Sequence, residues 1–532
     1  MGTVQKENTY KRFYYKLFNN LLKKKYFKKF YNEIEHVKPT KGKILLYAGI
    51  GHMYITPIEI LMYHLLRKQG YQVDYFIYDE TVAANEVITK QVVENQGKEK
   101  FWRHSVANAK RILNAAKIPY QFIIRTSTTK QQIAALKNDL DAILNYKYDG
   151  IDFGDIVKGV LYRYYKSLRF GEDAVAVAFD FLQTALTNYE QVKKLHTKNG
   201  YDAFYFSHGI YCTWQPVVAY CEANHIRYIC YDRAKRTGSA NFNINQPSPD
   251  WSFNHAWDRY ADRQLTDAEE QKVSEYLGER ELQKGDVYSY NASAKAADIN
   301  ALKKQLGIPE GRKVITIFTN LIWDAANVAR DIAFSSALDC IVATIKKYEG
   351  NDQVQVVVRA HPAEKILGTK ERYGNLVREA FHQQLPANVT IIEPEMEVNS
   401  FSVIELSDIG VVNTSTVGLE FAMLGKPIIL ISETNYRNKG FTYDATSTAH
   451  YFELMTHLLQ TGALLPEQVK LSRKYFYMMM FLYQQQMPAM FEGNHFLKYT
   501  YPHFNQIPET EDLYQLLTIA NDTQSTDFIK WK

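Results

Sequence analysis

The feature that most constrains the fold is a regular alternation of short apolar runs with helix-length segments in the second half of the chain. Strands separated by helical segments pair in parallel, because a parallel neighbour is reached only through a long crossover. We therefore expect a parallel sheet covered by helices. The predicted strands are 314–318, 354–358, 388–392, 409–412 and 427–431, and the predicted helices are 331–348, 401–405 (a helix start) and 416–424.

The first half of the chain opens with the same pattern. A strand is expected at 43–49, then a glycine turn, a helix that closes at Gly70, and a strand at 73–78. The turn contains Gly49 and Gly51 but lacks the third glycine of a dinucleotide fingerprint, so no nicotinamide or flavin cofactor is expected. After a stretch interpreted as mostly helical, strand patterns return at 203–206 and 227–231.

A chain of 532 residues has room for two large domains. The polar stretch 283–300 is predicted to link them, which gives one α/β domain at 40–290, with a helical insertion, and a second at 300–465. An N-terminal segment, 1–39, precedes them.

Positive charge is concentrated at the N-terminus. Residues 1–32 hold nine Lys or Arg against Glu7, a net charge of +8, whereas the whole chain carries +5. From Tyr10 to Tyr31 apolar residues recur every four positions, which predicts a basic amphipathic helix. Such a helix either lies on an anionic membrane surface or packs on the rest of the protein. Nucleic acid is not an expected partner, since the basic excess stops at this segment.

Neither a secretion signal nor a membrane-spanning segment is recognised. The longest apolar run, 475–483, is far shorter than the roughly 20 residues that a spanning helix needs. The four cysteines form no CxxC pair and are too few for a disulfide framework in a chain of this size. The expected location is cytoplasmic, with peripheral attachment to the inner face of the membrane through residues 10–31 as an alternative.

The sharpest motif follows the strand at 409–412 and reads Asn413-Thr414-Ser415-Thr416. A helix is expected to begin on these residues and to end at Gly425. Backbone N–H groups at a helix start, together with the hydroxyls of Ser415 and Thr416, suit a phosphate group. The same residue types are ordinary helix caps that need no ligand, so both interpretations stay open.

Two further loops follow predicted strands of the same sheet. Arg359-Ala360-His361-Pro362 comes after 354–358, and proline fixes the turn so that His361 is expected to face the ligand. Arg359 is a candidate hydrogen-bond donor to a phosphate group, and the alternative is that it forms a surface ion pair. For His361 the alternative is a structural role in the turn. The third loop, after 314–318, holds Asn320, Trp323 and Asp324. The three loops together predict one ligand site at the carboxyl edge of the sheet.

These motifs resemble those of bacterial capsule and surface-polysaccharide glycosyltransferases of the GT-B fold. The resemblance rests on three segments of the second half, 318–324, 359–362 and 413–427, and on two of the first half, 148–154 and 207–211, and it covers roughly residues 40 to 500. It implies two Rossmann-like domains facing an interdomain cleft. It also implies C-terminal helices, 466–532, that pack back towards the first domain.

The resemblance implies a nucleotide-sugar donor bound by the second domain. His361, Ser415 and Thr416 would hold the donor phosphates and Glu420 would reach the ribose, with Pro362 and Asn413 in the same site. The chain lacks a convincing DxD motif, in keeping with metal-independent transfer, and lacks the paired-acid glycine motif of bacterial sialyltransferases. No cofactor beyond the donor substrate is expected.

The predicted reaction is transfer of a sugar to a growing capsular or surface polysaccharide, the acceptor being a saccharide or a lipid-linked saccharide. An inverting enzyme needs a general base, for which His208, Asp152 and Asp232 are the candidates and His208 is favoured. His208 is alternatively structural, and a retaining enzyme needs no such base. Other interpretations are a teichoic-acid-type CDP-glycerol glycerophosphotransferase, a nucleotide-sugar epimerase and a noncatalytic saccharide-assembly subunit.

Overall fold

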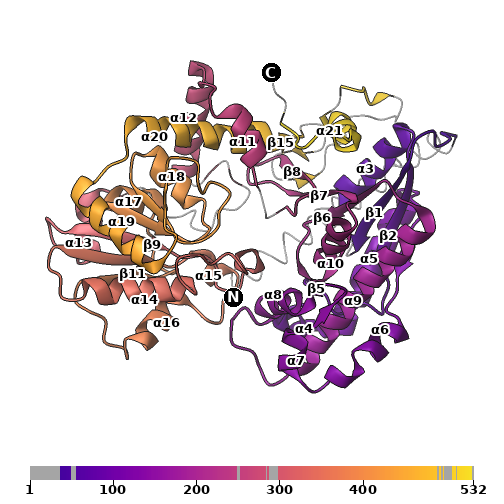
Figure 1. Ribbon diagram of the computed structural model, residues 1–532, viewed down its shortest axis with the longest axis horizontal. Coiled ribbons are helices and arrows are strands. Elements are labelled where there is room, and N and C mark those ends of the chain that lie inside the picture. Colours follow the sequence, from indigo (N-terminus) through magenta and orange to yellow (C-terminus); the bar gives the residue numbers. More distant parts are fainter. Residues whose placement is uncertain are drawn as a thin grey trace. The chain divides into compact units, whose positions relative to one another are not determined.

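The chain folds into two compact units in a computed structural model (Figure 1). The structure describes residues 36–49, 56–248, 252–282, 284, 286, 297–487, 491–492, 495–496, 506–510 and 512–529. The first unit comprises Met1–Tyr165, Phe170–Trp251 and Tyr483–Lys532, and the second comprises Lys166–Arg169 and Ser252–Leu482. The predicted basic helix at 10–31 lies outside the described residues, as do residues 50–55 of the first glycine turn.

The first unit is built on a seven-stranded sheet of order β15-β8-β7-β6-β1-β2-β3. Strands β3, β2, β1, β6 and β7 are parallel, whereas β8 runs antiparallel to β7 and β15 antiparallel to β8. The strands are β1 (Lys43–Gly49), β2 (Gln72–Tyr78), β3 (Gln121–Ile123), β6 (Ala203–Ser207), β7 (Arg227–Arg233), β8 (Ser239–Ile244) and β15 (Gln485–Gln486). Short hairpins lie outside this sheet: β4 (Lys147–Tyr148) with β5 (Ile151–Asp152), and β16 (Phe491–Glu492) with β17 (His495–Phe496).

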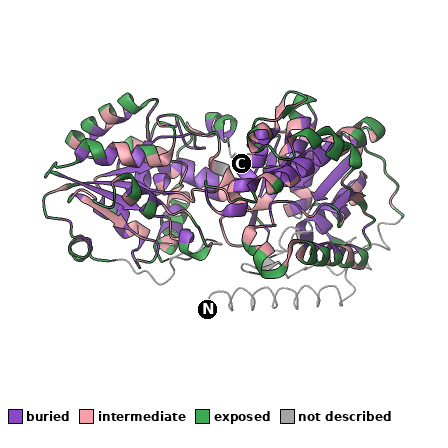
Figure 2. Ribbon diagram, turned by 90° about the horizontal axis from the view of Figure 1, so that it is seen from below, coloured by how far each residue is buried: buried purple, intermediate pink, exposed green. Residues whose placement is uncertain are grey.

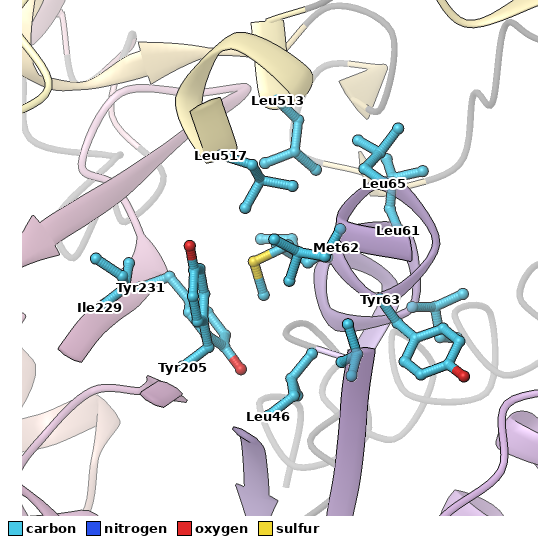
Figure 3. Packing of buried hydrophobic residues seen from close by; sticks show 14 of the residues in the cluster. Leu46, Leu61, Met62, Tyr63, Leu65, Tyr205, Ile229, Tyr231, Leu513 and Leu517 are labelled. Atoms are coloured by element: carbon cyan, nitrogen blue, oxygen red, sulfur yellow. The ribbon is translucent and has the colours of Figure 1, made fainter. Parts of the chain in front are cut away.

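Helices cover both faces of this sheet. They are α3 (Thr56–Lys68), α4 (Lys90–Gln96), α5 (Lys98–Ala115), α6 (Ser127–Gln132), α7 (Leu140–Leu144), α8 (Phe153–Tyr165), α9 (Ala174–Asn199), α10 (Tyr211–Ala223) and α21 (Asp512–Asn521). On one face, α3 and α21 pack on Tyr205, Ile229 and Tyr231 of the strands, and Figure 3 shows Leu513 and Leu517 of α21 meeting Met62 of α3 in this core. The late segment of the chain therefore completes the first unit's core.

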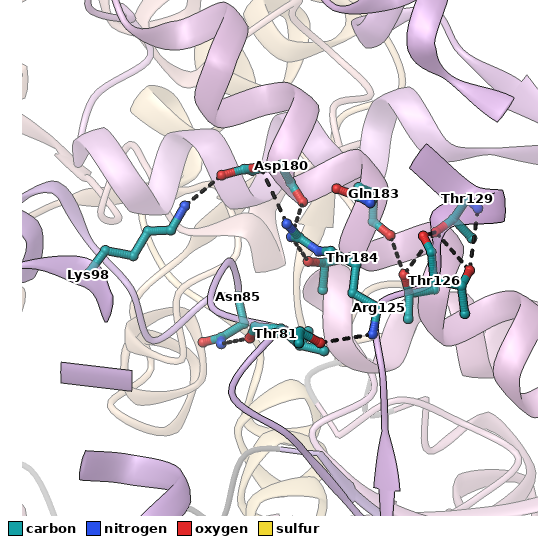
Figure 4. Close-up of polar contacts among 11 residues, drawn as sticks. Thr81, Asn85, Lys98, Arg125, Thr126, Thr129, Asp180, Gln183 and Thr184 are labelled. Carbon is teal, nitrogen blue, oxygen red and sulfur yellow. Dashed lines mark hydrogen bonds and ion pairs between the residues drawn. The ribbon is translucent and has the colours of Figure 1, made fainter. Parts of the chain in front are cut away.

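The loop after β3 is tied to α9 by a polar network (Figure 4). The Arg125 guanidinium donates to the backbone oxygen of Asp180 at 3.1 Å and to the Thr184 hydroxyl at 3.0 Å. Lys98 of α5 forms an ion pair with the Asp180 carboxylate at 2.6 Å. These contacts hold the carboxyl end of β3 in place, and they engage Arg125 in structural bonds.

The second unit is built on an entirely parallel six-stranded sheet of order β11-β10-β9-β12-β13-β14. Its strands are β9 (Lys313–Phe318), β10 (Val354–Arg359), β11 (Val389–Ile392), β12 (Ile409–Val412), β13 (Ile428–Leu430) and β14 (Tyr443–Asp444). Its helices are α11 (Asn254–Tyr260), α12 (Asp267–Glu281), α13 (Ile299–Gln305), α14 (Ala337–Tyr348), α15 (Ala363–Ile366), α16 (Tyr373–Ala380), α17 (Ser400–Leu406), α18 (Val417–Met423), α19 (Thr448–Thr461) and α20 (Pro466–Tyr477). In Figure 2 the central strands are coloured as buried, while the exposed colour follows the outer faces of the helices.

The predicted class, α/β with two sheets wound by helices, is confirmed; the second sheet is entirely parallel, whereas the first also holds the antiparallel strands β8 and β15. The strand predictions for 409–412 and 43–49 coincide with β12 and β1. The helix predicted at 331–348 begins later, at Ala337, because the Ser336 hydroxyl caps it by accepting from the backbone N–H of Asp339 at 3.1 Å. Inside the stretch interpreted as helical, β3 was missed.

The division into units differs from the predicted domains at three places, the first being Lys166–Arg169, which groups with the second unit. Helices α11 and α12, predicted to belong to the first domain, group with the second unit. The cause is packing on α20, where Arg473 donates to the Glu270 carboxylate at 2.7 Å and Trp257 meets the Tyr475 ring at 5.2 Å between centroids. Helix α20 thus stays in the second unit, and of the C-terminal segment only the part from Tyr483 onward joins the first.

None of the helices in the described ranges has both the length and the apolar character that crossing a bilayer requires. The four cysteines, Cys212, Cys221, Cys230 and Cys340, are buried free thiols.

Candidate functional site

The second unit has a topological switch point between β9 and β12. From β9 the sheet grows towards β10 and β11 on one side and towards β12, β13 and β14 on the other. In such sheets a crevice forms outside the carboxyl ends of the two strands where the order reverses. Phe318 and Val412 are paired at that edge, so the residues that follow each of them line the same place.

Polar side chains from both strand ends meet there. The Asn320 amide donates to the Thr414 hydroxyl, and also to Asn327 at 3.3 Å. The Thr414 hydroxyl in turn donates to the Asn327 amide oxygen. Two carbonyl oxygens of this cluster, Oδ1 of Asn320 and Oδ1 of Asn413, are buried without a hydrogen-bond partner. Buried hydrogen-bond acceptors normally have a partner, so two unbonded acceptors at one crevice indicate a site for a ligand with hydrogen-bond donors.

The turn that follows β12 leads directly into α18. The Ser415 hydroxyl accepts from the backbone N–H of Val417 at 3.3 Å, and Thr416 precedes α18 without a side-chain cap. The Tyr436 hydroxyl donates to the backbone oxygen of Ser415. A Cβ at Gly418 would overlap that same hydroxyl, so glycine is required for Tyr436 to hold the turn.

His361 lies at the end of the neighbouring strand β10. Its backbone N–H donates to the Thr319 hydroxyl at 3.1 Å, which links the loops after β10 and β9. Its Nδ1 accepts from the backbone N–H of Ala363 at 3.1 Å, and Pro362 begins the one-turn helix α15. The ring orientation is therefore set by the local backbone, as expected from the rigid turn.

Arg359 is not placed to bind a ligand, which corrects the assignment made from the sequence. The side chain is only 1% exposed, and its guanidinium donates to the backbone oxygens of Glu393 at 3.3 Å and Val398 at 3.1 Å. Burial lowers its pKa to about 10. The Arg359 side chain thus lies inside the protein, where it holds the loop after β11. It forms neither the predicted phosphate contact nor the surface ion pair.

Glu420 is also engaged elsewhere. It is buried on α18 and forms an ion pair with Arg280, which bonds Asp286 at 3.0 Å as well. A buried carboxylate paired with a guanidinium loses much of that stabilisation if it turns to another partner. The ribose contact expected of Glu420 is therefore withdrawn.

Trp323 and Asp324 support the loop after β9. The indole N–H of Trp323 is buried and donates to the Thr369 hydroxyl at 2.8 Å, while Lys166 lies 5.8 Å from the ring centroid. The backbone N–H of Asp324 closes a turn onto Leu321 at 3.1 Å. Trp323 thus positions the loop from behind rather than facing the crevice with its polar atom.

The first unit has its own switch point, between β1 and β6. Gly49 ends β1 with φ +64°, and a Cβ there would lie 2.7 Å from the Thr213 methyl group. After β6, His208 adopts a positive φ of 65°, and its Nε2 lies 3.6 Å from the Asp232 carboxylate at the end of β7. The imidazole stacks on Trp214 at 6.1 Å with 8° between the planes. His208 and Asp232 are therefore brought together.

Asp152, the third candidate base, lies elsewhere. It immediately precedes α8 and bonds the backbone N–H of Asp155 at 3.1 Å and Lys147 at 3.2 Å. Arg163, near the other end of α8, contacts Tyr211, whose ring lies 5.6 Å from that of His208. The length of α8, about 20 Å at 1.5 Å per residue, thus separates Asp152 from the switch point. Asp152 is not a candidate base.

Sequence inspection missed Glu86, a buried carboxyl beside the first switch point. It accepts from the Thr213 hydroxyl at 2.7 Å, and its backbone oxygen accepts from Arg163 at 2.9 Å. Burial raises its pKa to about 7. No motif surrounds Glu86, so its only sequence signal was its place in the loop that follows β2.

Among the described residues, no group of three or more His, Cys, Asp or Glu side chains is arranged to hold a metal ion.

Two units, each with a largely parallel sheet wound by helices and polar residues gathered at its switch point, define a protein built from two Rossmann-like folds. Residues 260–461 match the family described as capsule polysaccharide biosynthesis protein. The resemblance stated from the motifs is thereby confirmed for this part of the chain, which holds the whole switch point of the second unit.

Several solved structures are similar to the chain. The β-Kdo 2,4-transferase of KpsC from Thermosulfurimonas dismutans is 15% identical with a TM-score of 0.32, over 55% of this chain and 83% of that one. The UDP-GlcNAc 2-epimerase from Neisseria meningitidis is 15% identical with a TM-score of 0.24, over 81% and 94%. The spinosyn rhamnosyltransferase SpnG is 10% identical with a TM-score of 0.26, over 82% and 96%. No protein of curated function matches the chain by sequence.

Proposed function

We propose that the chain is a glycosyltransferase of capsule or surface-polysaccharide assembly, which transfers a sugar from a nucleotide-sugar donor to a saccharide or lipid-linked saccharide. The observation that carries the proposal is the cluster of Asn320, Asn413 and Thr414 at the switch point of the second unit. It lies within the segment that matches the capsule family. Its two unbonded amide oxygens require hydrogen-bond donors, which the hydroxyls of a ribose or a sugar supply.

The donor phosphates are assigned to the adjoining turn. The hydroxyls of Ser415 and Thr416 are hydrogen-bond donors, and His361 follows β10, which is separated from β12 by β9 in the same sheet. Preorganised donors in a site with little water stabilise the negative charge that develops on a departing phosphate. The proposed transfer is metal-independent, because these groups take the part that a metal ion plays in other transferases.

An inverting transfer needs a base for the acceptor hydroxyl, and we assign this role to His208. Its imidazole takes the hydroxyl proton while the new glycosidic bond forms and the sugar–phosphate bond breaks, its electron pair leaving with the nucleotide. The Asp232 carboxylate, 3.6 Å from Nε2, stabilises the imidazolium that results. Both side chains are about 30% exposed.

Product analysis after incubation with a panel of nucleotide sugars and CDP-glycerol tests the proposal. One nucleotide sugar should yield a glycosylated product, and Ser415→Ala or His361→Ala should each lower turnover at least tenfold. Thr456→Ala and His457→Ala, both on the exposed face of α19, are matched controls that should not change it.

Other outcomes decide against the proposal. Turnover of CDP-glycerol alone would identify a glycerophosphotransferase, and epimerisation of the sugar without transfer would identify an epimerase. An absence of any product would favour a noncatalytic assembly subunit. Unchanged turnover in both site variants would refute the phosphate assignment.

The proposed location is cytoplasmic, with residues 10–31 on an anionic membrane surface. Each Lys or Arg near such a surface contributes about 1 kcal/mol. Flotation with vesicles of phosphatidylserine and phosphatidylcholine should carry the full chain but not a chain lacking residues 1–40. Equal flotation of both would remove the membrane role.

A further inference from the structure

Strands β7 and β8 present a polar face at the edge of the first unit's switch point. Ile229 and Tyr231 of β7 point into the apolar core shared with α3 and α21 (Figure 3). Because side chains alternate along a strand, Asp232 points to the opposite face. Asn241 of β8 is paired directly with Asp232, and paired residues of antiparallel strands project on the same side. Asn241 therefore lies beside the His208–Asp232 pair.

The carboxamide of Asn241 is buried and unbonded. The residue is 0% exposed, and neither its amide nitrogen nor its amide oxygen has a hydrogen-bond partner. Asn188, which is equally buried in the same unit, shows the usual arrangement: it accepts from the Tyr47 hydroxyl at 2.6 Å and donates to the Tyr78 hydroxyl at 2.6 Å. A buried amide with both functions unsatisfied carries a desolvation cost that a ligand would remove.

We propose that Asn241 binds a hydroxyl group of the acceptor saccharide beside His208 and Asp232. A hydroxyl both donates and accepts, so one such group satisfies the amide oxygen and the amide nitrogen in turn. A phosphate or a carboxylate only accepts and an ammonium only donates, so each would leave one amide function unbonded. The chemistry of Asn241 therefore fits the hydroxyl groups of a polyol or sugar better than a charged ligand.

The position of Asn241 fits the partly exposed His208–Asp232 pair. Paired residues of adjacent strands have Cβ atoms about 5 Å apart, which places Asn241 next to Asp232 and across β7 from His208, so a sugar ring bound by both would span β7. Asn241 is then a specificity residue that recognises one hydroxyl of the ring, while His208 takes the proton of another. This inference rests on the proposed function for the identity of the ligand as acceptor.

Substituting leucine separates the role in binding from a role in folding. Asn241→Leu keeps the side-chain volume and removes an unbonded polar group, so the variant should melt at the same temperature as the wild type or a few degrees higher. Tyr348→Phe is the matched control, because it also removes a buried unbonded polar atom, but in the second unit. Asn241→Ala serves as a second variant should the leucine be too bulky.

The test is saturation-transfer NMR on the full chain with methyl glycosides of glucose, galactose, mannose and N-acetylglucosamine. At least one should bind the wild type, with affinity reduced fivefold or more in Asn241→Leu and Asn241→Ala and unchanged in Tyr348→Phe. Unchanged affinity in the two Asn241 variants, or no methyl glycoside bound by the wild type, overturns the inference. Binding needs no turnover, so Asn241-dependent binding without transfer from any nucleotide sugar would refute the proposed function and leave this site standing.

Discussion

Substituting Gly418 tests how Tyr436 holds the turn between β12 and α18 in place. A Cβ at this position would overlap the Tyr436 hydroxyl and lie 3.0 Å from the ring carbon that bears it. Tyr436 is 1% exposed and stacks on Phe441 at 6.4 Å between centroids, so it has little room to move. Overpacking of this kind costs about 1 to 3 kcal/mol, and alanine recovers about 0.5 to 1 kcal/mol of helix propensity. We expect Gly418→Ala to destabilise the chain by about 1 to 2 kcal/mol.

A double-mutant cycle with Tyr436→Phe isolates this contact. Tyr436→Phe alone removes the hydrogen bond to Ser415 and should cost about 1 kcal/mol. In the double variant the hydroxyl that the Cβ would overlap is gone. The double variant should therefore lose about 1 kcal/mol less unfolding free energy than the two single variants lose together. Urea unfolding followed by fluorescence measures each free energy. Gly278→Ala in α12, where nothing lies within 4 Å of the added Cβ, is the control and should stabilise the chain slightly.

Two results would refute this reasoning. Additivity of Gly418→Ala and Tyr436→Phe within about 0.3 kcal/mol would show that the two residues do not compete for space. A Gly418→Ala variant as stable as Gly278→Ala would show that the turn relaxes freely.

Three further predictions concern pH, the loop after β9 and the base. Burial raises the pKa of Glu59 from 4.5 to about 7, so the folded state keeps a proton that the unfolded chain releases. Glu59 should therefore contribute a loss of stability of about 3 kcal/mol as pH rises from about 4.5 to 7, and Glu59→Gln should reduce the pH dependence of thermal melts by that amount. Trp323→Phe removes the bond to Thr369 and should cost about 1 kcal/mol and raise the donor KM several-fold, whereas an unchanged KM would remove the loop from the donor site. In turnover assays His208→Gln should lose about a hundredfold or more, while Asp152→Asn should stay within twofold of the wild type; the reverse ranking would contradict the assignment of the base.

The sequence was sufficient to predict the strands that carry dense apolar runs. Strand β12, with four buried residues between polar neighbours, was predicted to the residue. Strand β3 was missed because it has three residues, of which Gln121 is exposed, and pairing with β2 rather than its own composition makes it a strand. Strand β8 was missed for a similar reason, since its alternating Asn residues are buried by tertiary packing that no local pattern reveals.

Side-chain direction was the part of the site that the sequence could not supply. The position of Arg359 after an apolar run was recognised, but its direction depends on the loop after β11, which it holds by two backbone bonds. The partner of Glu420 is 140 residues away in the chain, in a helix predicted to belong to the other domain. Sequence order likewise gave no sign that Asp152 is separated from His208 by the length of α8. By contrast, His208 and Asp232 each come directly after or at the end of a neighbouring parallel strand, and these strand ends bring them together.

We propose that a nucleotide occupies the switch point of the second unit, and calorimetric titration with UDP, GDP, CDP and CMP measures this binding. One of these nucleotides should bind with a stoichiometry of one. Asn413→Leu and Ser415→Ala should each weaken that binding at least tenfold, while Thr456→Ala on α19 leaves it unchanged. Binding that is equally strong in all the variants, or no binding of any of the four nucleotides, would contradict the account.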